Sequence, residues 1–318
     1  MNNIFLTGRT SFIGKNLLPK LKDEGYDVHY LVKQSSENAK LFSDDKHAQL
    51  GDLLNYDSLY RSICEVKPDI IIHLAALTPV RLSWLEPIKY QMVNYLGTVN
   101  LLEACINQLQ KPFWFIYASS AEVYGNQFHK MPLKEDYSPL NPISPYAVSK
   151  ANAEAYLKMR KLSTDFDLTI LRPNNTYGRK NSGYFVESMI EQMLYPKGNQ
   201  TCTYSTSDVS LVTLYNATHI RDYLHIDDHV SAYLHILKNK LEGTFNVAQG
   251  EPISNYDMVV LMAKTLNTPV LIETRGPDLP RPCDQEAIVQ DCSKIRATGW
   301  KPKFSRVEGI TKLRGMYN

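Results

Sequence analysis

The sequence is short of cysteine and of net charge, and each shortage excludes a class of protein. Its five cysteines are scattered and contain no Cys-x-x-Cys pair: Cys64, Cys105, Cys202, Cys283 and Cys292. A disulfide framework or a zinc site is therefore not expected, and a reducing compartment fits better. The net charge is only +2 and no Lys/Arg-rich run occurs, which argues against a nucleic-acid partner.

Long apolar runs are missing as well. No stretch approaches the ~20 apolar residues that a membrane helix needs, and the first six residues lack a basic segment followed by an apolar signal core. We therefore expect a soluble, cytoplasmic protein without membrane contact. What the chain does have is length and apolar content, because 318 residues, 43% of them hydrophobic, suffice for one large domain or two coupled ones.

In the first half of the chain, short apolar runs alternate with longer amphipathic stretches. The apolar runs are typical of buried strands and lie at residues 4–6, 28–32, 70–74 and 113–117. Helical spacing occurs at residues 12–24, 56–65, 87–109 and 146–162, and Pro19 allows a kink or an early stop in the first of these. Strands that alternate with helices predict an α/β fold, with a parallel sheet covered on both faces.

Beyond Arg172 this alternation is lost. Residues 179–218 are polar and rich in Tyr and Thr, and regular patterns return only at 223–237 and 244–247. The break predicts a sheet domain of residues 1–173 plus about 219–248. A smaller, discontinuous C-terminal domain would then comprise about 174–218 plus 249–318.

A loop with two glycines, Thr7-Gly8-Arg9-Thr10-Ser11-Phe12-Ile13-Gly14, follows the first predicted strand directly. Glycines at a strand-to-helix turn let the backbone approach a pyrophosphate, and the helix N-terminus offers free N–H donors. A G-x-x-G-x-x-G loop would have glycine where Ser11 stands, and the Cβ atom of serine restricts φ. The alternative interpretation is an ordinary turn.

Basic residues near the end of the second strand bear on the choice of cofactor. A dinucleotide fold that binds the ribose 2′-hydroxyl places an acid about twenty residues past the loop, whereas this chain has Lys33 there and Arg9 in the loop. Two cations favour a 2′-phosphate and hence NADP over NAD, unless both are solvated surface charges. Asp52 is a candidate acceptor near adenine, and Leu74-Ala75-Ala76 offers small residues for a close approach.

Tyr146 and Lys150 share one face of a predicted helix, because they are four residues apart. The phenol of tyrosine has a pKa of about 10 and is a weak base at neutral pH. A neighbouring ammonium group and the positive nicotinamide ring would stabilise the phenolate, which could then take a proton from a substrate hydroxyl. Ser120 follows a predicted strand and could hydrogen-bond the same oxygen.

In the order of its motifs the chain resembles the NAD(P)-dependent nucleotide-sugar epimerase/dehydratase family of the extended short-chain dehydrogenase/reductase superfamily. The matching stretches run nearly from end to end: TGRTSFIG, GDL, HLAAL, NYLGTVNLLEA, SSAEVYG, SPYAVSK, RPNNTYG, RDYLHIDD, GTFNVA and RPCD. This resemblance implies a Rossmann-like doubly wound parallel sheet that holds NAD(P), and a smaller C-terminal α/β domain that holds a nucleoside-diphosphate sugar. It also implies a homodimer through helices 87–109 and 146–162, although the apolar faces of these helices could equally be core.

The resemblance implies a set of site residues. Ser120, Tyr146 and Lys150 fall on the catalytic positions, and no metal is expected. We expect cofactor contacts from Gly8, Arg9, Thr10, Ser11, Phe12, Ile13, Gly14, Lys33, Asp52, Leu53, Leu74, Ala75, Ala76, Asn94, Ala118, Tyr146, Lys150 and Arg172. We expect substrate contacts from Thr78, Ser120, Glu122, Tyr146, Asn175, Arg179, Arg221 and Arg281, of which Arg221 and Arg281 resemble clamps on the diphosphate.

Glu122 bears on which reaction the family resemblance implies. If the extended backbone after residue 117 continues, Glu122 and Ser120 share one face. In 4,6-dehydratases a glutamate at this position removes the C5 proton, but Ala121 cannot supply the acid that often precedes it. C4 epimerisation is therefore favoured, and a 4,6-dehydratase with Glu122 as base and an NADPH-dependent reductase of a 4-keto-6-deoxyhexose remain alternatives. Glu122 could also merely brace a backbone N–H group, and a non-catalytic NADP-binding regulator is a more distant alternative.

Overall fold

Seven parallel strands form the central sheet, in the order β11-β6-β5-β4-β1-β2-β3. The structure is a computed structural model and describes residues 2–33, 42, 45–127, 131–195, 209–276 and 283–317. The strands are β1 (Asn3–Thr7), β2 (Asp27–Lys33), β3 (Ala48–Gly51), β4 (Ile70–His73), β5 (Trp114–Ala118), β6 (Asp167–Pro173) and β11 (Gly243–Val247). The strand order reverses between β1 and β4, which is where doubly wound sheets bind ligands.

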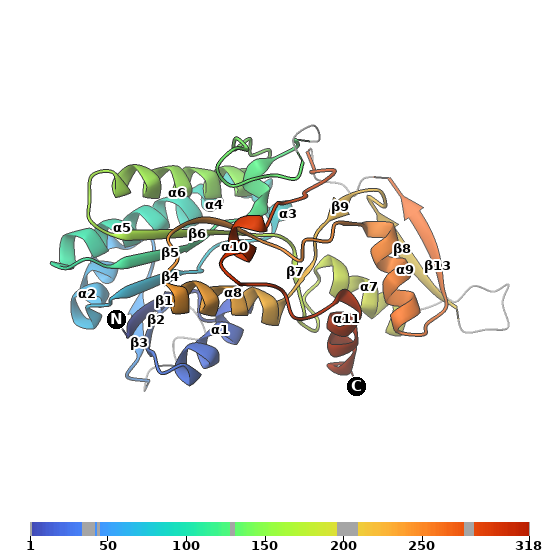
Figure 1. Ribbon diagram of the computed structural model, residues 1–318, viewed down its shortest axis with the longest axis horizontal. Coiled ribbons are helices and arrows are strands. Elements are labelled where there is room, and N and C mark those ends of the chain that lie inside the picture. Colours follow the sequence, from blue (N-terminus) through green and yellow to red (C-terminus); the bar gives the residue numbers. More distant parts are fainter. Residues whose placement is uncertain are drawn as a thin grey trace.

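Helices cover both faces of this sheet (Figure 1). Helices α1 (Phe12–Asp23) and α8 (Ile226–Asn239) bury Leu17 and Tyr233 in one core, together with the inward side chains of the strands. On the opposite face, α2 (Tyr56–Val66), α5 (Gly97–Gln108) and α6 (Pro145–Lys161) bury Ile63, Leu101 and Leu157 in a second core. The predicted doubly wound α/β fold is thus confirmed.

A second group of elements packs around its own apolar cluster, at the right of Figure 1. It contains α7 (Phe185–Leu194), α9 (Asn255–Thr265) and α11 (Arg306–Gly315), with β8 (Ser210–Tyr215) parallel to β13 (Val270–Arg275). Two-residue strands pair nearby, β7 (Thr176–Tyr177) with β10 (Leu224–His225), and β9 (Ile220–Arg221) with β12 (Ile253–Ser254). However, Ile295 of α10 (Ser293–Ala297) and Trp300 pack into the core of the large sheet. The predicted domain boundaries therefore stay a prediction.

Several local features differ from the sequence-based expectations. Strand β3 was not predicted, and α1 does not stop early at Pro19 but continues to Asp23. The single helix expected at 87–109 consists of α4 (Pro87–Tyr90), a π-helical segment η2 (Gln91–Leu96) and α5. Short π-helical segments inside α-helices frequently accompany functional sites, and this one contains the buried Asn94 described below.

His73, the last residue of β4, ties the sheet to a helix through two buried hydrogen bonds. Its Nδ1 atom lies 2.6 Å from Thr7 Oγ1, and its Nε2 atom lies 2.9 Å from Thr98 Oγ1. Burial, assisted by the charge of Lys150, lowers the pKa of His73 to about 3. The neutral imidazole is therefore the form that the folded protein accommodates.

This shift predicts a pH-dependent loss of stability. An unfolded histidine has a pKa of about 6.5, so the contribution of neutral His73 is complete above that pH. As the pH falls from 6.5 toward 3, protonation favours the unfolded chain, by up to about 1.4 kcal/mol for each pH unit. We expect His73→Asn, which cannot titrate, to lower the slope of unfolding free energy against pH by about this amount between pH 6 and 4.

Urea unfolding of both proteins, followed by circular dichroism, measures the two slopes. The comparison isolates His73, because the buried His225 and His229, whose pKa burial lowers to about 4, are present in both proteins. A lower stability of the variant at pH 7 is compatible with the prediction. Equal slopes would contradict it.

Candidate active site

The loop between β1 and α1 lies at the point where the strand order reverses. Gly8 has a φ of +78°, and a Cβ atom there would lie 2.6 Å from the backbone nitrogen of Ala75. A Cβ atom on Gly14 would lie 2.2 Å from the carbonyl oxygen of Gly8. Only glycine allows these close approaches, which leave the loop as a cradle of the kind that receives a pyrophosphate. The residues present here therefore fit a dinucleotide.

Ser11, the departure from the expected glycine pattern, adopts an ordinary extended conformation with a φ of −67°. Its hydroxyl caps α1 by accepting a hydrogen bond of 3.0 Å from the backbone N–H of Gly14. The Cβ atom of serine therefore causes no strain, and the cap satisfies one of the free donors of the first turn.

Arg9 and the end of β2 form one edge of this region. The Arg9 guanidinium stacks on the rings of Tyr30 and Phe42, at 4.2 and 3.9 Å from their centroids. Lys33, by contrast, forms an ion pair with Asp52, whose Oδ2 atom lies 3.1 Å from the lysine Nζ atom. The structure thus pairs Lys33 with Asp52, the residue that we predicted as a hydrogen-bond acceptor near adenine.

The Asn94 amide is engaged in hydrogen bonds within the protein. Its Oδ1 atom accepts a hydrogen bond from the Leu77 backbone N–H at 2.8 Å, and its Nδ2 group donates to the Leu77 carbonyl and to Ser149 Oγ, both at 3.0 Å. The side chain is buried. Asn94 therefore holds the loop after β4 against α6, and its contact with a cofactor stays a prediction.

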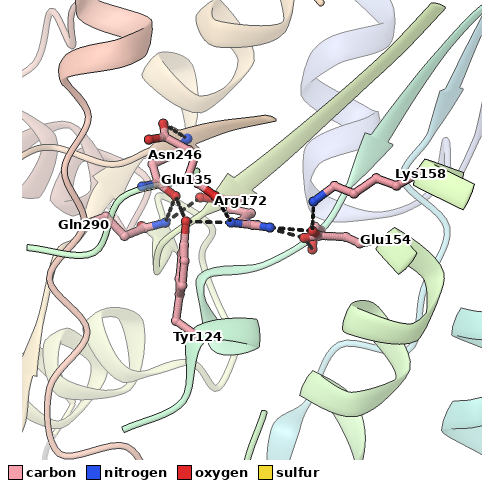
Figure 2. Close-up of polar contacts among 8 residues, drawn as sticks. Tyr124, Glu135, Glu154, Lys158, Arg172, Asn246 and Gln290 are labelled. Atoms are coloured by element: carbon pink, nitrogen blue, oxygen red, sulfur yellow. Dashed lines mark hydrogen bonds and ion pairs between the residues drawn. The ribbon is translucent and has the colours of Figure 1, made fainter. Parts of the chain in front are cut away.

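The Arg172 guanidinium lies inside the protein (Figure 2). The Nε and Nη2 atoms donate to the two carboxylate oxygens of Glu154 at 2.9 and 2.6 Å, and Nη1 donates to the Tyr124 hydroxyl at 2.8 Å. The side chain is only 1% exposed, and it forms an ion pair within the core. The predicted contact of Arg172 with a cofactor stays a prediction.

The other predicted cofactor residues lie around the ends of β1, β3, β4 and β5. Leu53 and Leu74 are buried, while Ala75, Ala76 and Ala118 are half-buried. Their contact with a cofactor stays a prediction, as it does for Thr10, Phe12 and Ile13 in the loop.

The three predicted catalytic residues come together where β5 ends against α6. Ser144 caps this helix, and Tyr146 and Lys150 project from its first two turns. The Tyr146 phenol is hydrogen-bonded with Ser120, and its ring meets that of Tyr90 edge-on at 6.4 Å. Lys150 Nζ donates to the carbonyl oxygen of Ala118 at 2.7 Å. The arrangement places a phenol, a hydroxyl and an amine beside the end of one strand.

Burial sets the protonation of this group. It raises the pKa of Tyr146 above its ordinary value; the hydrogen bond with Ser120 opposes that effect, whereas the nearby Glu122 carboxylate adds to it. Burial lowers the pKa of Lys150 to about 7, and the negative charge of Glu154 acts in the opposite direction. Tyr146 therefore needs a cation beside it to act as a base near neutral pH, and Lys150 is close to losing its proton under the same conditions.

The extended backbone that would have placed Glu122 and Ser120 on one face does not continue. Strand β5 ends at Ala118, and residues Ala121–Tyr124 form a 3₁₀ turn, η3. The Ser120 hydroxyl caps this turn by accepting a hydrogen bond from the Glu122 backbone N–H at 3.2 Å. Glu122 is half-buried and close enough to Tyr146 to raise its pKa. The premise of an extended strand was wrong, yet Glu122 lies beside the site.

The substrate side contains a residue that the sequence analysis missed, Tyr184. Its hydroxyl lies 3.1 Å from Thr78 Oγ1, in the loop after β4. Arg179 places its guanidinium 5.2 Å from the ring centroid of Phe12 and 5.7 Å from that of Tyr184. Two predicted substrate residues thus meet the tyrosine that directly precedes α7. Asn175 lies close to Arg179 in the sequence. It is exposed, so its side chain is accessible to a ligand.

Arg221 lies on β9 and is largely buried. Its Nη2 group lies 3.4 Å from the Asp284 carboxylate, and Nη1 donates to the Ile220 carbonyl at 2.9 Å. The acidic residue of the RPCD stretch therefore orients the arginine of RDYLHIDD. Arg281, the other predicted clamp, lies outside the described residues.

In the part of the chain that the structure describes, no cluster of His, Cys, Asp or Glu could hold a metal ion. Among the same described residues, no helix is long and apolar enough to span a membrane.

Comparison with known proteins yields a coherent group of relatives. Residues 5–313 match the family described as GDP-mannose 4,6 dehydratase. The UDP-glucose 4-epimerase of Lactobacillus helveticus is 27% identical over 325 residues, covering 96% of this chain and 94% of that protein. The GDP-6-deoxy-D-mannose reductase of Pseudomonas aeruginosa is 29% identical over 315 residues, covering 98% of this chain and 95% of that protein.

The solved structures that are similar to this chain include a UDP-glucose 4-epimerase, as the relatives do. The UDP-glucose 4-epimerase of Thermus thermophilus in complex with NAD has a TM-score of 0.81 and 28% identity, covering 98% of this chain and 99% of that chain. RMD from Pseudomonas aeruginosa complexed with NADPH has a TM-score of 0.79 and 25% identity, covering 99% of this chain and 98% of that chain.

Proposed function

The chain belongs to the GDP-mannose 4,6 dehydratase family of NAD(P)-dependent, extended short-chain dehydrogenase/reductase enzymes, and we propose that it epimerises C4 of a nucleoside-diphosphate sugar through a 4-keto intermediate. The observation that carries this proposal is the meeting of Tyr146, Ser120 and Lys150 at the end of β5, beside a loop that fits a dinucleotide. The family predicted from the sequence is confirmed by the match over most of the chain.

Tyr146 acts as the base in this proposal. It takes the proton of the C4 hydroxyl, while Ser120 hydrogen-bonds the same oxygen and the Lys150 ammonium stabilises the phenolate. NAD(P) would be held by the loop from Gly8 to Gly14 and would supply reversible hydride transfer at C4, with return to the opposite face of the ketone in an epimerase. Tyr146 then gives the proton back, so the substrate and its product have the same atoms.

The chemistry at positions 121 and 122 favours epimerisation over dehydration. Ala121 has no proton to donate to a leaving hydroxyl, which a 4,6-dehydratase needs, whereas Glu122 would serve as its base. An NADPH-dependent 4-ketoreductase is the second candidate, because the Arg9 cation lies at the edge of the loop. Asn175, Arg179, Arg221 and Arg281 are proposed to hold the diphosphate or the sugar. A cytoplasmic location stays a prediction from the scattered cysteines.

The reaction itself is tested by incubating the protein in D₂O with UDP-, GDP- and dTDP-hexoses, without added cofactor and then with NADPH. Chromatography and mass spectrometry are expected to show an isomer without carbon-bound deuterium, because the hydride returns internally. Loss of water with deuterium at C5 or C6 would instead establish a dehydratase, and turnover of 4-keto sugars only with NADPH a reductase. Lack of turnover despite bound cofactor would support the alternative of a non-catalytic NADP-binding regulator.

Matched variants assign the roles in whichever reaction is found. Tyr146→Phe should lower turnover by about 10²–10⁴-fold while cofactor affinity is kept, because only the proton-transferring hydroxyl is lost. Tyr137→Phe is the control, since that side chain is 85% exposed. Glu122→Gln should leave an epimerase largely active and disable a dehydratase. Retained activity in Tyr146→Phe would refute the assigned base.

The preference for NADP over NAD is proposed on the state of Arg9. Its Nη1 atom is buried and, within the described residues, has no hydrogen-bond partner, although its guanidinium is held between two rings. A 2′-phosphate would supply that partner. Arg9→Leu should therefore weaken NADPH binding by about tenfold or more and NADH binding little, as titration calorimetry would measure. An equal loss for both cofactors would show that Arg9 only braces the loop.

The homodimer is also a proposal, supported by an exposed apolar stripe. Ile88, Met92 and Leu96 recur every four residues along α4 and η2, with 75%, 43% and 42% of their surfaces exposed. Such a stripe on a helix beside α6 fits burial against a second copy. Light scattering should give twice the chain mass, and Ile88→Asp with Met92→Asp should give a monomer. Leu271→Asp, at a 49% exposed position on β13, is the control. A monomeric wild-type protein would contradict the proposal.

A further inference from the structure

Glu154 follows Lys150 by one helical turn and is the most enclosed carboxylate near the proposed catalytic residues. Its side chain has no exposed surface, yet it accepts four polar contacts (Figure 2). Ser119 Oγ donates to Oε1 at 2.5 Å, Arg172 donates to both oxygens, and Lys158 Nζ lies 3.3 Å from Oε2. Burial alone would raise the pKa of Glu154, but the hydrogen bonds and charge of Arg172 outweigh it, so the carboxyl is ionised.

These contacts reach both segments that supply catalytic residues. Ser119 precedes Ser120 directly, so its hydrogen bond fixes the end of β5 against α6. Arg172 extends the connection to Tyr124, the last residue of the turn that contains Glu122. The Tyr124 hydroxyl in turn donates to Asn246 Oδ1 at 2.8 Å, on β11. The strand-end residues and the helix residues are thereby held to one buried ion pair.

Lys150 lies within reach of several titratable groups. On its own helix these are Tyr146 and Glu154; on β5 the Tyr117 ring centroid lies 4.9 Å from Nζ, and on β4 His73 senses its charge. Beyond Glu154 lie Arg172 of β6 and Lys158 of α6. His73 is neutral and the tyrosines are protonated, so the negative charge that Lys150 meets on its own helix is that of Glu154.

We propose that Glu154 is a positioning residue of the active site, whose carboxylate is the counter-ion that keeps Lys150 as an ammonium group, while Arg172 keeps Glu154 ionised and in place. This inference rests on the role of Lys150 in the proposed function. The charge of Lys150 then depends on the ion pair between Glu154 and Arg172, which lies one helical turn beyond the Tyr-x-x-x-Lys motif. The sequence therefore reads Tyr146, Lys150, Glu154 along one helix face, with the base, the cation and its counter-ion in order.

The test measures the protonation of Lys150 directly and needs no substrate. Protein labelled with ¹³C at the lysine Cε atoms is titrated by NMR, and the Lys150 resonance is assigned by its loss in Lys150→Met. Removing a negative charge one helical turn away is expected to lower the midpoint by about one pH unit or more. We expect the Lys150 midpoint to be highest in the wild type, lower in the double variant Glu154→Gln/Arg172→Gln, and lowest in Glu154→Gln alone. The single variant is lowest because its unpaired arginine repels Lys150 further.

The double variant keeps the test decisive if Glu154→Gln does not fold. A neutral glutamine pair can hydrogen-bond and leaves no uncompensated buried charge. The control is Glu103→Gln, which breaks a similar two-bond pair with Arg160 of α6, at 2.7 and 3.0 Å, on a partly exposed surface. No shift is expected there.

An unchanged midpoint in the charge-removing variants, or an equal shift in Glu103→Gln, would overturn the inference. Once a substrate is known, the pH at which turnover declines on the alkaline side should move down with the midpoint, while cofactor affinity at pH 6 is unchanged. A shifted midpoint without turnover of any nucleotide sugar would leave this inference standing and refute the proposed reaction.

Discussion

The ion pair between Glu154 and Arg172 is the interaction on which the arrangement of the active site depends. A buried pair of this kind contributes little net stability, because desolvation offsets the attraction, but removing one partner costs about 3–5 kcal/mol. What the ion pair does is hold neighbouring segments in a fixed arrangement. The carboxylate is shared by the end of β5, helix α6 and β6, so a shift of α6 against β6 would separate the charges, and a shift of the end of β5 would break the Ser119 hydrogen bond. Gln290, which donates to the Arg172 carbonyl at 2.9 Å, connects the C-terminal segment to the same point.

The cofactor side is fixed by different means. There the backbone segments approach so closely that Gly8 and Gly14 admit no side-chain atom. Short polar contacts then hold the neighbouring loop, with His73 between Thr7 and Thr98, and Asn94 around Leu77. Steric fit at one end of the site and a buried charge at the other thus position two groups of residues that are far apart in the sequence.

Much of this could be predicted from the sequence, for identifiable reasons. The apolar runs of the sheet and the spacing of Tyr146 and Lys150 are local patterns, and the structure places the pair beside Ser120 as expected. The internal hydrogen bonds of Asn94 and Arg172 could not be predicted, because a motif does not show which way a polar side chain turns. The extended geometry assumed for Glu122 failed because Ser120 caps a 3₁₀ turn. Tyr184 could not be found from a motif, since its contact with Thr78 is purely tertiary.

The contacts of Tyr184 with Thr78 and of Arg179 with Phe12 have a kinetic consequence. They join a segment of the C-terminal half to the loops that follow β4 and β1. We expect the release of a dinucleotide bound at these loops to require that the contacts part. An epimerase does not need this release, because its cofactor ends each cycle in the redox state in which it began. A reductase needs it at every cycle, so we expect the residence time of its cofactor to depend on the segment that contains Arg179 and Tyr184.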